Sequence, residues 1–353
     1  MENSPKGWSR GGLESVEYCP ACGSDARSEA VYTRRDNECW MPDLWNMVGC
    51  AACGSLYLDP RPDACSLPKA YSSYFTHQSE NEPGGGNGPA GIVWPLINGY
   101  LNWRFGARRI PAKRIGALAF LVVEPFRLKL DYHGRHLFLS KFPRRGRLLD
   151  LGCGNGAFMA RSREMGWSVF GCDPDPKAVA ICQEQGLDVT LGDVFSESLN
   201  AKRFEVITVS HVIEHVANPQ ALLRRAYDLL VPGGLLWIAL PNPESLGLRV
   251  FGAAWRGLHV PYHLCIPSQS QLVKWLKYER FSSVRLLRRG AQGRHPRTDS
   301  LAIAAREKLS VPPRIVTAIL FILSDFIGTF TTRWSEETVV TAIKPKADNA
   351  QAN

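Results

Sequence analysis

This chain has no apolar run of the roughly 20 residues that a membrane-spanning helix requires. Its most apolar regions, residues 92–142 and 311–330, are short or interrupted by charged residues such as Asp325. The polar start, Met1 to Arg10, lacks the apolar core of a secretory signal peptide. We therefore expect a cytoplasmic protein, either free or held peripherally at the inner face of the membrane.

No internal repeat is visible in the sequence, which excludes a repeat architecture. The 353 residues are more than one core usually needs, so two domains, or one domain with insertions, are expected. Acidic residues are outnumbered by basic ones, and the net charge of +9 fits an anionic partner: a phosphate-bearing metabolite, a membrane surface or nucleic acid. A solvated basic surface explains the charge equally well.

Ten cysteines in a chain without a leader indicate a reducing compartment, where paired cysteines more often hold a metal than form disulfides. Cys19 with Cys22 and Cys50 with Cys53 form two Cys-x2-Cys pairs. Four thiolates suit a closed, tetrahedral, structural zinc site, and we predict a zinc ribbon over residues 1–62. The stretch between the pairs is longer than usual, and two unrelated turns with free thiols are the alternative.

Residues 63–91 are interpreted as a linker, because their Gly- and Pro-rich part cannot bury enough surface to order itself. Residues 92–142 alternate aromatic and aliphatic clusters with basic residues. Two interpretations remain open for them: an amphipathic element at a membrane interface, or a helical lid that packs over the substrate pocket. A second hydrophobic helical insert is expected over residues 300–335, and the two inserts together would form one patch.

The stretch after Arg147 is the most informative part of the chain. An apolar strand ends at Asp150, and Gly152, Gly154 and Gly156 follow before a helix begins. Glycine lets the backbone turn tightly and approach a ligand closely. Alone, this pattern also fits a dinucleotide site.

Two further acids decide between the ligands. Asp173 ends a second strand about 20 residues past the glycine loop, where a ribose-binding carboxylate is expected, and Asp193 follows a third strand. A carboxylate beside the loop gains nothing from a pyrophosphate but attracts an ammonium and a sulfonium in a partly dry cleft. Asp150, Asp173 and Asp193 therefore favour S-adenosylmethionine over NAD, at its methionine end, ribose hydroxyls and adenine amino group respectively.

At this point the chain resembles the class I S-adenosylmethionine-dependent methyltransferases. The matching motifs are Leu149-Asp-Leu-Gly-Cys-Gly-Asn-Gly156, Gly171-Cys-Asp-Pro-Asp175, Gly192-Asp-Val194, Ser210-His-Val-Ile-Glu-His-Val216 and Pro232-Gly-Gly-Leu-Leu-Trp237. The resemblance implies an α/β fold with a doubly wound, seven-stranded, Rossmann-like sheet over residues 143–346 and a disordered tail over residues 347–353. It adds Pro174, Val194 and Ser210 to the cofactor-binding residues. A doubly wound domain with an empty or NAD-type crevice is the alternative.

The order of elements within this domain follows from the same patterns. Strands are expected up to residue 150 and over residues 168–173, 187–191, 204–210, 235–240, 281–288 and 337–344. Helices are expected over residues 157–165, 176–185 and 220–230, the last ended by the turn Pro232-Gly-Gly234. By family resemblance, the final strand is inserted antiparallel.

Two histidine clusters are candidates for the chemistry. His211, Glu214 and His215 follow the fourth strand, at the edge where ligands gather in open α/β sheets. Ubiquinone-biosynthesis O-methyltransferases resemble this segment with two acids and a histidine, for which a divalent metal is proposed. His211 replaces the first acid here, which weakens the metal interpretation. Glu214 and His215 either act directly or cap and orient the loop beside the cofactor.

The second cluster, His259-Val-Pro-Tyr-His-Leu264, follows the fifth strand. Similar methyltransferases carry a Pro-x-His-Leu segment there that faces the acceptor. Methyl transfer depends on alignment, and a hydroxyl acceptor also needs a base, which histidine supplies near neutral pH. We expect His263 to be that general base; a histidine that only shapes the loop is the alternative.

Together these motifs predict an S-adenosylmethionine-dependent methyltransferase (EC 2.1.1.-), O-directed, acting on a small-molecule, glycan or lipid-linked acceptor. A zinc ribbon followed by Tyr71-Ser-Ser-Tyr-Phe75 resembles a subgroup common in sugar, polysaccharide and secondary metabolism. The alternative is a zinc-ribbon RNA methyltransferase that grips nucleic acid with its positive charge. The absence of the Asn/Asp-Pro-Pro-Tyr motif argues against it, whereas aromatics among basic residues over 92–129 would suit base stacking.

Overall fold

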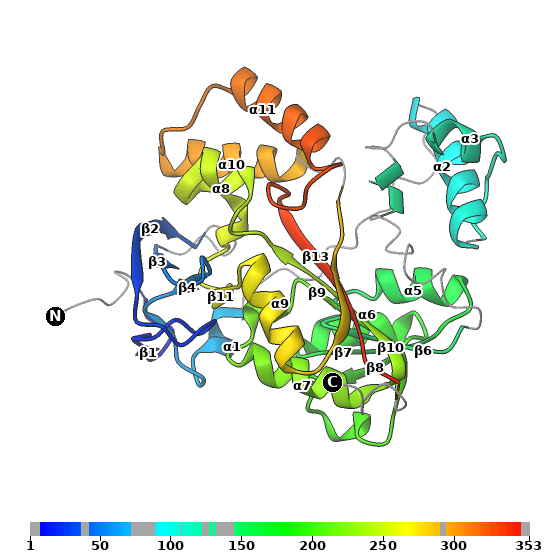
Figure 1. Ribbon diagram of the computed structural model, residues 1–353, viewed down its shortest axis with the longest axis horizontal. Helices are drawn as coiled ribbons and strands as arrows, with labels where there is room; N and C mark the ends of the chain where they lie inside the picture. Colours follow the sequence, from blue (N-terminus) through cyan, green and yellow to red (C-terminus); the bar gives the residue numbers. More distant parts are fainter. Residues whose placement is uncertain are drawn as a thin grey trace.

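A computed structural model describes residues 8–36, 42–71, 89–106, 108–121, 127–128, 130–131, 145–289 and 294–346. These residues form a seven-stranded mixed sheet, a four-stranded antiparallel sheet and a short two-stranded sheet, β1 with β5 (Figure 1). The expected tail, most of the expected linker and parts of the first insert lie outside the described residues.

The seven-stranded sheet has the order β12-β13-β10-β9-β6-β7-β8. Its strands are β6 (Arg147–Leu151), β7 (Ser168–Asp173), β8 (Asp188–Leu191), β9 (Phe204–Ser210), β10 (Leu230–Pro241), β12 (Ser282–Leu286) and β13 (Glu337–Ile343). Neighbours from β10 to β8 are parallel, and β13 runs antiparallel to both β10 and β12. The expected α/β fold and the antiparallel insertion of the last strand are confirmed.

Helices cover both faces of this sheet. They are α5 (Ala157–Glu164), α6 (Pro176–Glu184), α7 (Pro219–Leu229) and α9 (Gln269–Tyr278). Successive strand residues point to opposite faces, so Leu149 and Ile207 pack in one core with α7 and α9. Their neighbours Leu148 and Val206 pack in a second core with α5 and α6. Burial on both faces explains why these strands are nearly continuous apolar runs.

The junction between α7 and β10 differs from the expectation. The side chain of Asn218 accepts a hydrogen bond from the Ala221 amide and caps the helix. The helix ends at Leu229, because Leu230 is already extended and pairs with β9. Pro232-Gly-Gly234 therefore lies within a register irregularity of β10 instead of ending the helix.

The N-terminal sheet has the order β11-β4-β3-β2. Its strands are β2 (Arg27–Arg35), β3 (Leu44–Cys50), β4 (Leu56–Leu58) and β11 (Cys265–Ile266); β1 (Leu13–Glu14) and β5 (Arg61–Pro62) lie beside it. β11 comes from the loop region after β10, so the two parts of the chain share one sheet. Hydrogen bonds from the amides of Leu58 and Ser268, to Leu264 and Ser55, strengthen this junction.

The remaining helices lie outside the two layers that cover the large sheet. They are α1 (Leu67–Ala70), α2 (Pro89–Phe105), α3 (Gly116–Leu121), α8 (Leu246–Phe251), α10 (Arg294–Glu307), α11 (Arg314–Ile327) and the 3-10 turns η3 (Glu197–Leu199), η4 (Ile213–His215), η5 (Gly252–Ala254) and η6 (Arg256–Leu258). α2 and α3 fall in the first expected insert, α10 and α11 in the second. Within the described ranges, no helix has both the length and the apolar character to cross a membrane.

Candidate functional site

Three glycines in left-handed conformations shape the loop between β6 and α5. Gly152, Gly154 and Gly156 have φ of 65°, 51° and 75°, which side chains rarely adopt. A Cβ on Gly152 would lie 2.4 Å from Val212, and one on Gly156 would lie 2.5 Å from Leu187. A Cβ on Gly154 would have nothing within 4 Å, so this glycine faces open space. The loop is thus built from close packing on two sides and an accessible backbone at Gly154.

Three acids lie at the carboxyl ends of the neighbouring strands β6, β7 and β8. Asp150 is buried and accepts a hydrogen bond from the Thr208 hydroxyl. Asp173 accepts the amide of Gly154 at 2.9 Å, which joins the second strand to the glycine loop. Asp193 is exposed, and its carboxylate accepts the amide of Phe195 at 2.9 Å. Parallel strands therefore bring the three predicted acids to one edge of the sheet.

The remaining predicted cofactor residues lie on the same edge. Pro174 is exposed after β7, and Val194 is buried after β8. Ser210 ends β9, and its buried hydroxyl hydrogen-bonds to nothing within the described residues. The open space at Gly154, the carboxylates and this hydroxyl fit a ligand with cationic and hydroxyl groups. The arrangement suits the predicted S-adenosylmethionine.

The two histidine clusters of the sequence form one cluster in the structure. His215 ends the turn η4, whereas His259 and His263 lie in the loop after η6. The ring centroid of His263 is 4.6 Å from that of His215 and 4.9 Å from that of His259. The Leu264 amide donates to the Glu214 carbonyl at 2.8 Å and holds the two segments together.

Backbone carbonyls orient two of these rings. Nδ1 of His263 lies 2.9 Å from the Gly257 carbonyl oxygen, and Nδ1 of His215 lies 3.1 Å from the Tyr262 carbonyl oxygen. Because a carbonyl can only accept, we assign the ring proton to Nδ1 in both residues, which leaves Nε2 with its lone pair. Burial lowers the pKa of His215 to about 4 and that of His263 well below its usual value. Both rings are therefore neutral near pH 7.

His211 has a different environment. Its Nδ1 lies 3.4 Å from Glu214 and its Nε2 lies 3.2 Å from Glu337. Partial desolvation lowers the pKa of His211, but the two carboxylates outweigh this effect and raise it to about 9. His211 is thus a cation between two acids, and the candidate metal set of His211, Glu214 and His215 is not the one whose ligand atoms converge.

Two members of this site are not predicted from the sequence. His259 belongs to the second predicted segment without a role of its own, although its Nδ1 lies 3.4 Å from Nε2 of His263. The hydroxyl of Tyr71, from the end of α1, lies 2.8 Å from Nδ1 of His215. Tyr71 begins the aromatic segment 71–75, which resembles that of one methyltransferase subgroup, but no sequence pattern connects this segment to His215.

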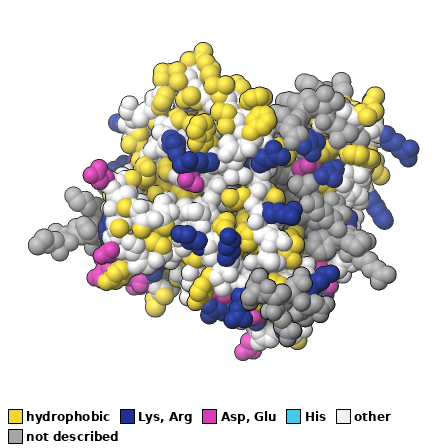
Figure 2. Space-filling model, viewed as in Figure 1, with side chains coloured by type: hydrophobic (Ala, Val, Ile, Leu, Met, Phe, Trp, Pro, Cys, Tyr) yellow, Lys and Arg dark blue, Asp and Glu magenta, His cyan; other side chains and the backbone are white. Residues whose placement is uncertain are grey.

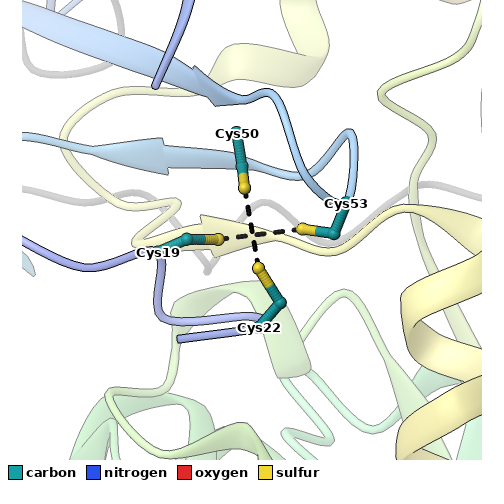
Figure 3. Close-up of side chains that lie close together, drawn as sticks. All are labelled: Cys19, Cys22, Cys50 and Cys53. Atoms are coloured by element: carbon teal, nitrogen blue, oxygen red, sulfur yellow. Dashed lines mark hydrogen bonds between the residues drawn. The ribbon is translucent and has the colours of Figure 1, made fainter. Parts of the chain in front are cut away.

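The four predicted zinc ligands converge on one point (Figure 3). The sulfurs of Cys19 and Cys53 are 3.8 Å apart, and those of Cys22 and Cys50 are 3.6 Å apart. A zinc–sulfur distance of about 2.3 Å places the sulfurs of a regular tetrahedron about 3.8 Å apart, so the residues fit this ion. The hydrogen bond between the Cys19 and Cys53 thiols lowers the pKa of Cys53 to about 4 and raises that of Cys19. In contrast, Cys65 lies apart from the cluster, and Cys39 is outside the described residues.

The chain is similar in sequence to known methyltransferases. Residues 127–280 match the family described as "Methyltransferase domain". The ubiquinone biosynthesis O-methyltransferase of Cereibacter sphaeroides is 35% identical over 117 residues, which cover 31% of this chain and 47% of the relative. The enzyme of the same description from Xanthomonas oryzae pv. oryzae is 29% identical over 165 residues, 42% of this chain and 66% of the relative. The chain spans about half the length of the first of these curated relatives.

A SAM-dependent methyltransferase of known structure from Archaeoglobus fulgidus is 21% identical, with a TM-score of 0.43 over 64% of this chain and 99% of that one. Residues 127–280 are therefore similar to methyltransferase domains.

Proposed function

We propose that this protein is an S-adenosylmethionine-dependent methyltransferase (EC 2.1.1.-) that methylates an oxygen atom of a small-molecule, glycan or lipid-linked acceptor. The observation that carries the proposal is the edge of the sheet at which the left-handed glycine loop and three carboxylates meet. When bound, S-adenosylmethionine supplies an electrophilic methyl group on a sulfonium. Asp150, Asp173 and Asp193 would hold its methionine end, ribose and adenine respectively.

The acceptor is expected at the histidine cluster. The neutral ring of His263 has a lone pair on Nε2 and is suited to take a proton from a hydroxyl near pH 7. Glu214 and His215 would border the acceptor beside this base, because the Glu214 carboxylate lies 3.8 Å from Nε2 of His263 and the ring centroid of His215 lies 4.6 Å from that of His263. We propose His263 as the general base on this ground.

The cysteine cluster would hold zinc in a purely structural role. All four positions of a tetrahedron are filled by sulfur, so no position is left for a substrate. The metal would instead fix the N-terminal sheet, to which β11 is hydrogen-bonded. β11 directly follows the segment 259–264, which carries His259 and His263 and is called the acceptor loop below.

A hydrophobic face on α11 favours an acceptor or partner at a membrane. Large apolar side chains on this face and just after the helix are 40–73% exposed: Ile315, Val316, Ile319, Ile322, Leu323 and Phe326 on α11, and Phe330 after it. Several recur at intervals of three or four residues, which places them on one side of the helix. Figure 2 shows hydrophobic side chains gathered at the top of the molecule, where α11 lies in Figure 1.

The positive charge of the chain favours a membrane surface as the partner of this face. The chain carries a net charge of +9, and Arg314 and Arg333 are exposed near the two ends of the apolar stripe. Arginines beside an apolar face attract anionic headgroups, while the apolar residues enter the acyl boundary. We propose that α11 lies in the surface of an anionic membrane and gives the enzyme access to a lipid-linked acceptor.

The direct test is incubation of the purified protein with methyl-labelled S-adenosylmethionine and a cell extract, followed by separation into lipid, aqueous and RNA fractions. Label in the lipid or aqueous small-molecule fraction supports the proposal, and label in lipid favours the membrane-side acceptor. Label in RNA alone contradicts it and favours a nucleic-acid methyltransferase. Calorimetry of S-adenosylmethionine binding, with NAD as the control, tests the cofactor independently of the acceptor.

A further inference from the structure

We propose that His215, His259 and His263 bind a divalent transition-metal ion at a second metal site, separate from the four-cysteine cluster, with a coordination position left open for the acceptor. One ligand atom from each ring lies within 4.8 Å of the others. Three imidazoles with an open position form a ligand set of the kind found in catalytic zinc sites, and imidazole also suits iron, copper and nickel.

Two of the three rings make the hydrogen bonds that a metal site requires. A ligating histidine nearly always donates its other ring N–H to a carbonyl or carboxylate, which fixes the ring and presents the free nitrogen. His215 and His263 each direct Nδ1 to a backbone carbonyl oxygen, at 3.1 Å and 2.9 Å. These contacts fix both rings, and Nε2 of His263 lies 3.4 Å from Nδ1 of His259 inside the cluster.

The spacing also fits an ion. Nδ1 of His259 lies 3.4 Å from Nε2 of His263. Two nitrogens that bind one zinc ion at about 2.0–2.1 Å in tetrahedral geometry lie about 3.3–3.4 Å apart. The 4.8 Å limit for the whole set means that the other nitrogens need to move by little more than 1 Å to reach the same separation.

A buried carboxylate adjoins the cluster. Glu214 is fully buried, and neither of its carboxylate oxygens makes a hydrogen bond within the described residues. One of these oxygens lies 3.8 Å from Nε2 of His263, so two atoms with lone pairs face each other. The nearby cation His211 is shared with Glu337, which Arg289 also contacts at 2.8 Å. A divalent ion among the three rings would be attracted by the Glu214 carboxylate.

The role of this ion in methylation rests on the proposed function. The ion would accept the oxygen of the acceptor hydroxyl at its open position and lower the pKa of that hydroxyl. His263 would be the base in the metal-free site; with the ion bound, its Nε2 is a ligand and has no lone pair to offer, so the hydroxyl proton would pass to Glu214 instead, whose carboxylate lies 3.8 Å from that Nε2. The alkoxide oxygen then forms a bond to the methyl carbon, and the carbon–sulfur bond breaks with its electron pair going to sulfur. S-Adenosylhomocysteine and the methyl ether are the products.

The test is the metal content of the full-length protein after incubation with excess zinc and removal of unbound ion. We expect two zinc ions per chain in the wild type, one in each site. His259→Ala and His215→Ala should each retain a single ion, and zinc binding at the second site should weaken about 100-fold or more. His295→Ala is the matched control, because this histidine is exposed on α10, and it should retain two.

Cobalt substitution distinguishes the two sites and guards against a folding defect. Cobalt at the cysteine cluster gives thiolate charge-transfer absorption, which His259→Ala should preserve and which shows that the N-terminal sheet is intact. The second, sulfur-free cobalt spectrum should disappear in that variant. The proposal would be overturned if the wild-type protein bound a single zinc ion, or if His259→Ala and His215→Ala still bound two. If the protein bound two zinc ions but transferred no methyl group to any fraction of the extract, the three-histidine metal site would stand and the proposed function would be refuted.

Discussion

Gly154 is the residue at which the loop geometry can be separated from ligand contact. Its φ of 51° is left-handed, and a Cβ there would meet nothing within 4 Å. Gly186, in the turn between α6 and β8, has a φ of 65° and equally open surroundings, but it lies away from the strand ends. Both glycines therefore have a left-handed backbone conformation, but only Gly154 faces the proposed cofactor site.

We predict that Gly154→Ala and Gly186→Ala each lower the free energy of unfolding by about 1–2 kcal/mol, the cost of a side chain in the left-handed region. Gly154→Ala alone should weaken S-adenosylmethionine binding, by tenfold or more, because its methyl group enters the ligand space. Urea unfolding and calorimetry measure the two effects. Equal cofactor affinity in the two variants would move the cofactor away from this loop.

His263→Ala tests the reaction at the acceptor side. The imidazole lies in the histidine cluster and not among the cofactor residues, so the variant should lower turnover by about 100-fold or more while cofactor affinity stays within threefold. His295→Ala, on the exposed side of α10, should change neither. Steady-state kinetics and calorimetry on both variants decide the matter, and unchanged turnover in His263→Ala would remove it from the mechanism.

Glu336 links stability to pH. It accepts hydrogen bonds from the Gly247 amide and the Trp255 indole, yet burial raises its pKa to about 7 from 4.5. The folded state thus holds a proton that the unfolded chain releases, so this group stabilises most below pH 4.5 and loses its contribution as pH rises through 7. We predict that Glu336→Gln gains stability relative to the wild type by about 3 kcal/mol between pH 4.5 and pH 8. Denaturant unfolding at several pH values checks this, and a constant difference would contradict it.

At the scale of elements, the junction of β11 with β4 joins the N-terminal sheet to the acceptor loop. Ser268 caps α9, and its hydroxyl also donates to the Cys53 carbonyl at 2.6 Å. Side chains of α9 reach the other cysteine pair, since Gln271 and Trp275 both donate to the Ala21 carbonyl. The four-cysteine cluster and the proposed acceptor loop are therefore parts of one hydrogen-bonded unit.

A ligand substitution tests this unit. Cys22→Ser should release the zinc ion and lower the melting temperature by roughly 10 °C, since several kcal/mol of metal binding are lost and each is equivalent to about 2–4 °C. Cys65→Ser is the control, because Cys65 is an exposed cysteine outside the cluster. Metal analysis and thermal unfolding measure both variants. A melting temperature unchanged in Cys22→Ser would mean that zinc does not support the fold.

The elements show what the sequence could predict. Strands such as Phe204–Ser210 were predictable because both of their faces are buried, which leaves a continuous apolar run. β11 was not, because two residues carry no periodicity and its partner lies far away in the chain. The contact between His215 and His263 was not predictable for the same reason, because it depends on hydrogen bonds between distant loops, from Leu264 to Glu214 and from His215 to Tyr262. Local pattern identifies elements and motifs, whereas contacts between distant loops require the folded structure.

At the scale of the whole molecule, charge and the apolar face of α11 together determine where the protein would act. We predict that it binds vesicles of phosphatidylcholine with phosphatidylglycerol, and binds less well as salt is raised or the anionic lipid is removed. Ile322→Asp should weaken this binding about tenfold, because the loss of one inserted side chain costs about 1.5 kcal/mol or more. Tyr278→Asp, at an equally exposed position on α9, is the control. If Ile322→Asp co-sedimented with the vesicles as well as the wild-type protein does, α11 would be excluded as the membrane contact.

The shared sheet of β4 and β11 also has a physiological consequence. A cell that runs short of zinc, or an oxidant that attacks the thiolates, would loosen the strand beside the acceptor histidines while the methyl donor remained abundant. We expect methylation to stop under such conditions well before the chain is degraded, so that the small N-terminal module makes the reaction dependent on zinc supply.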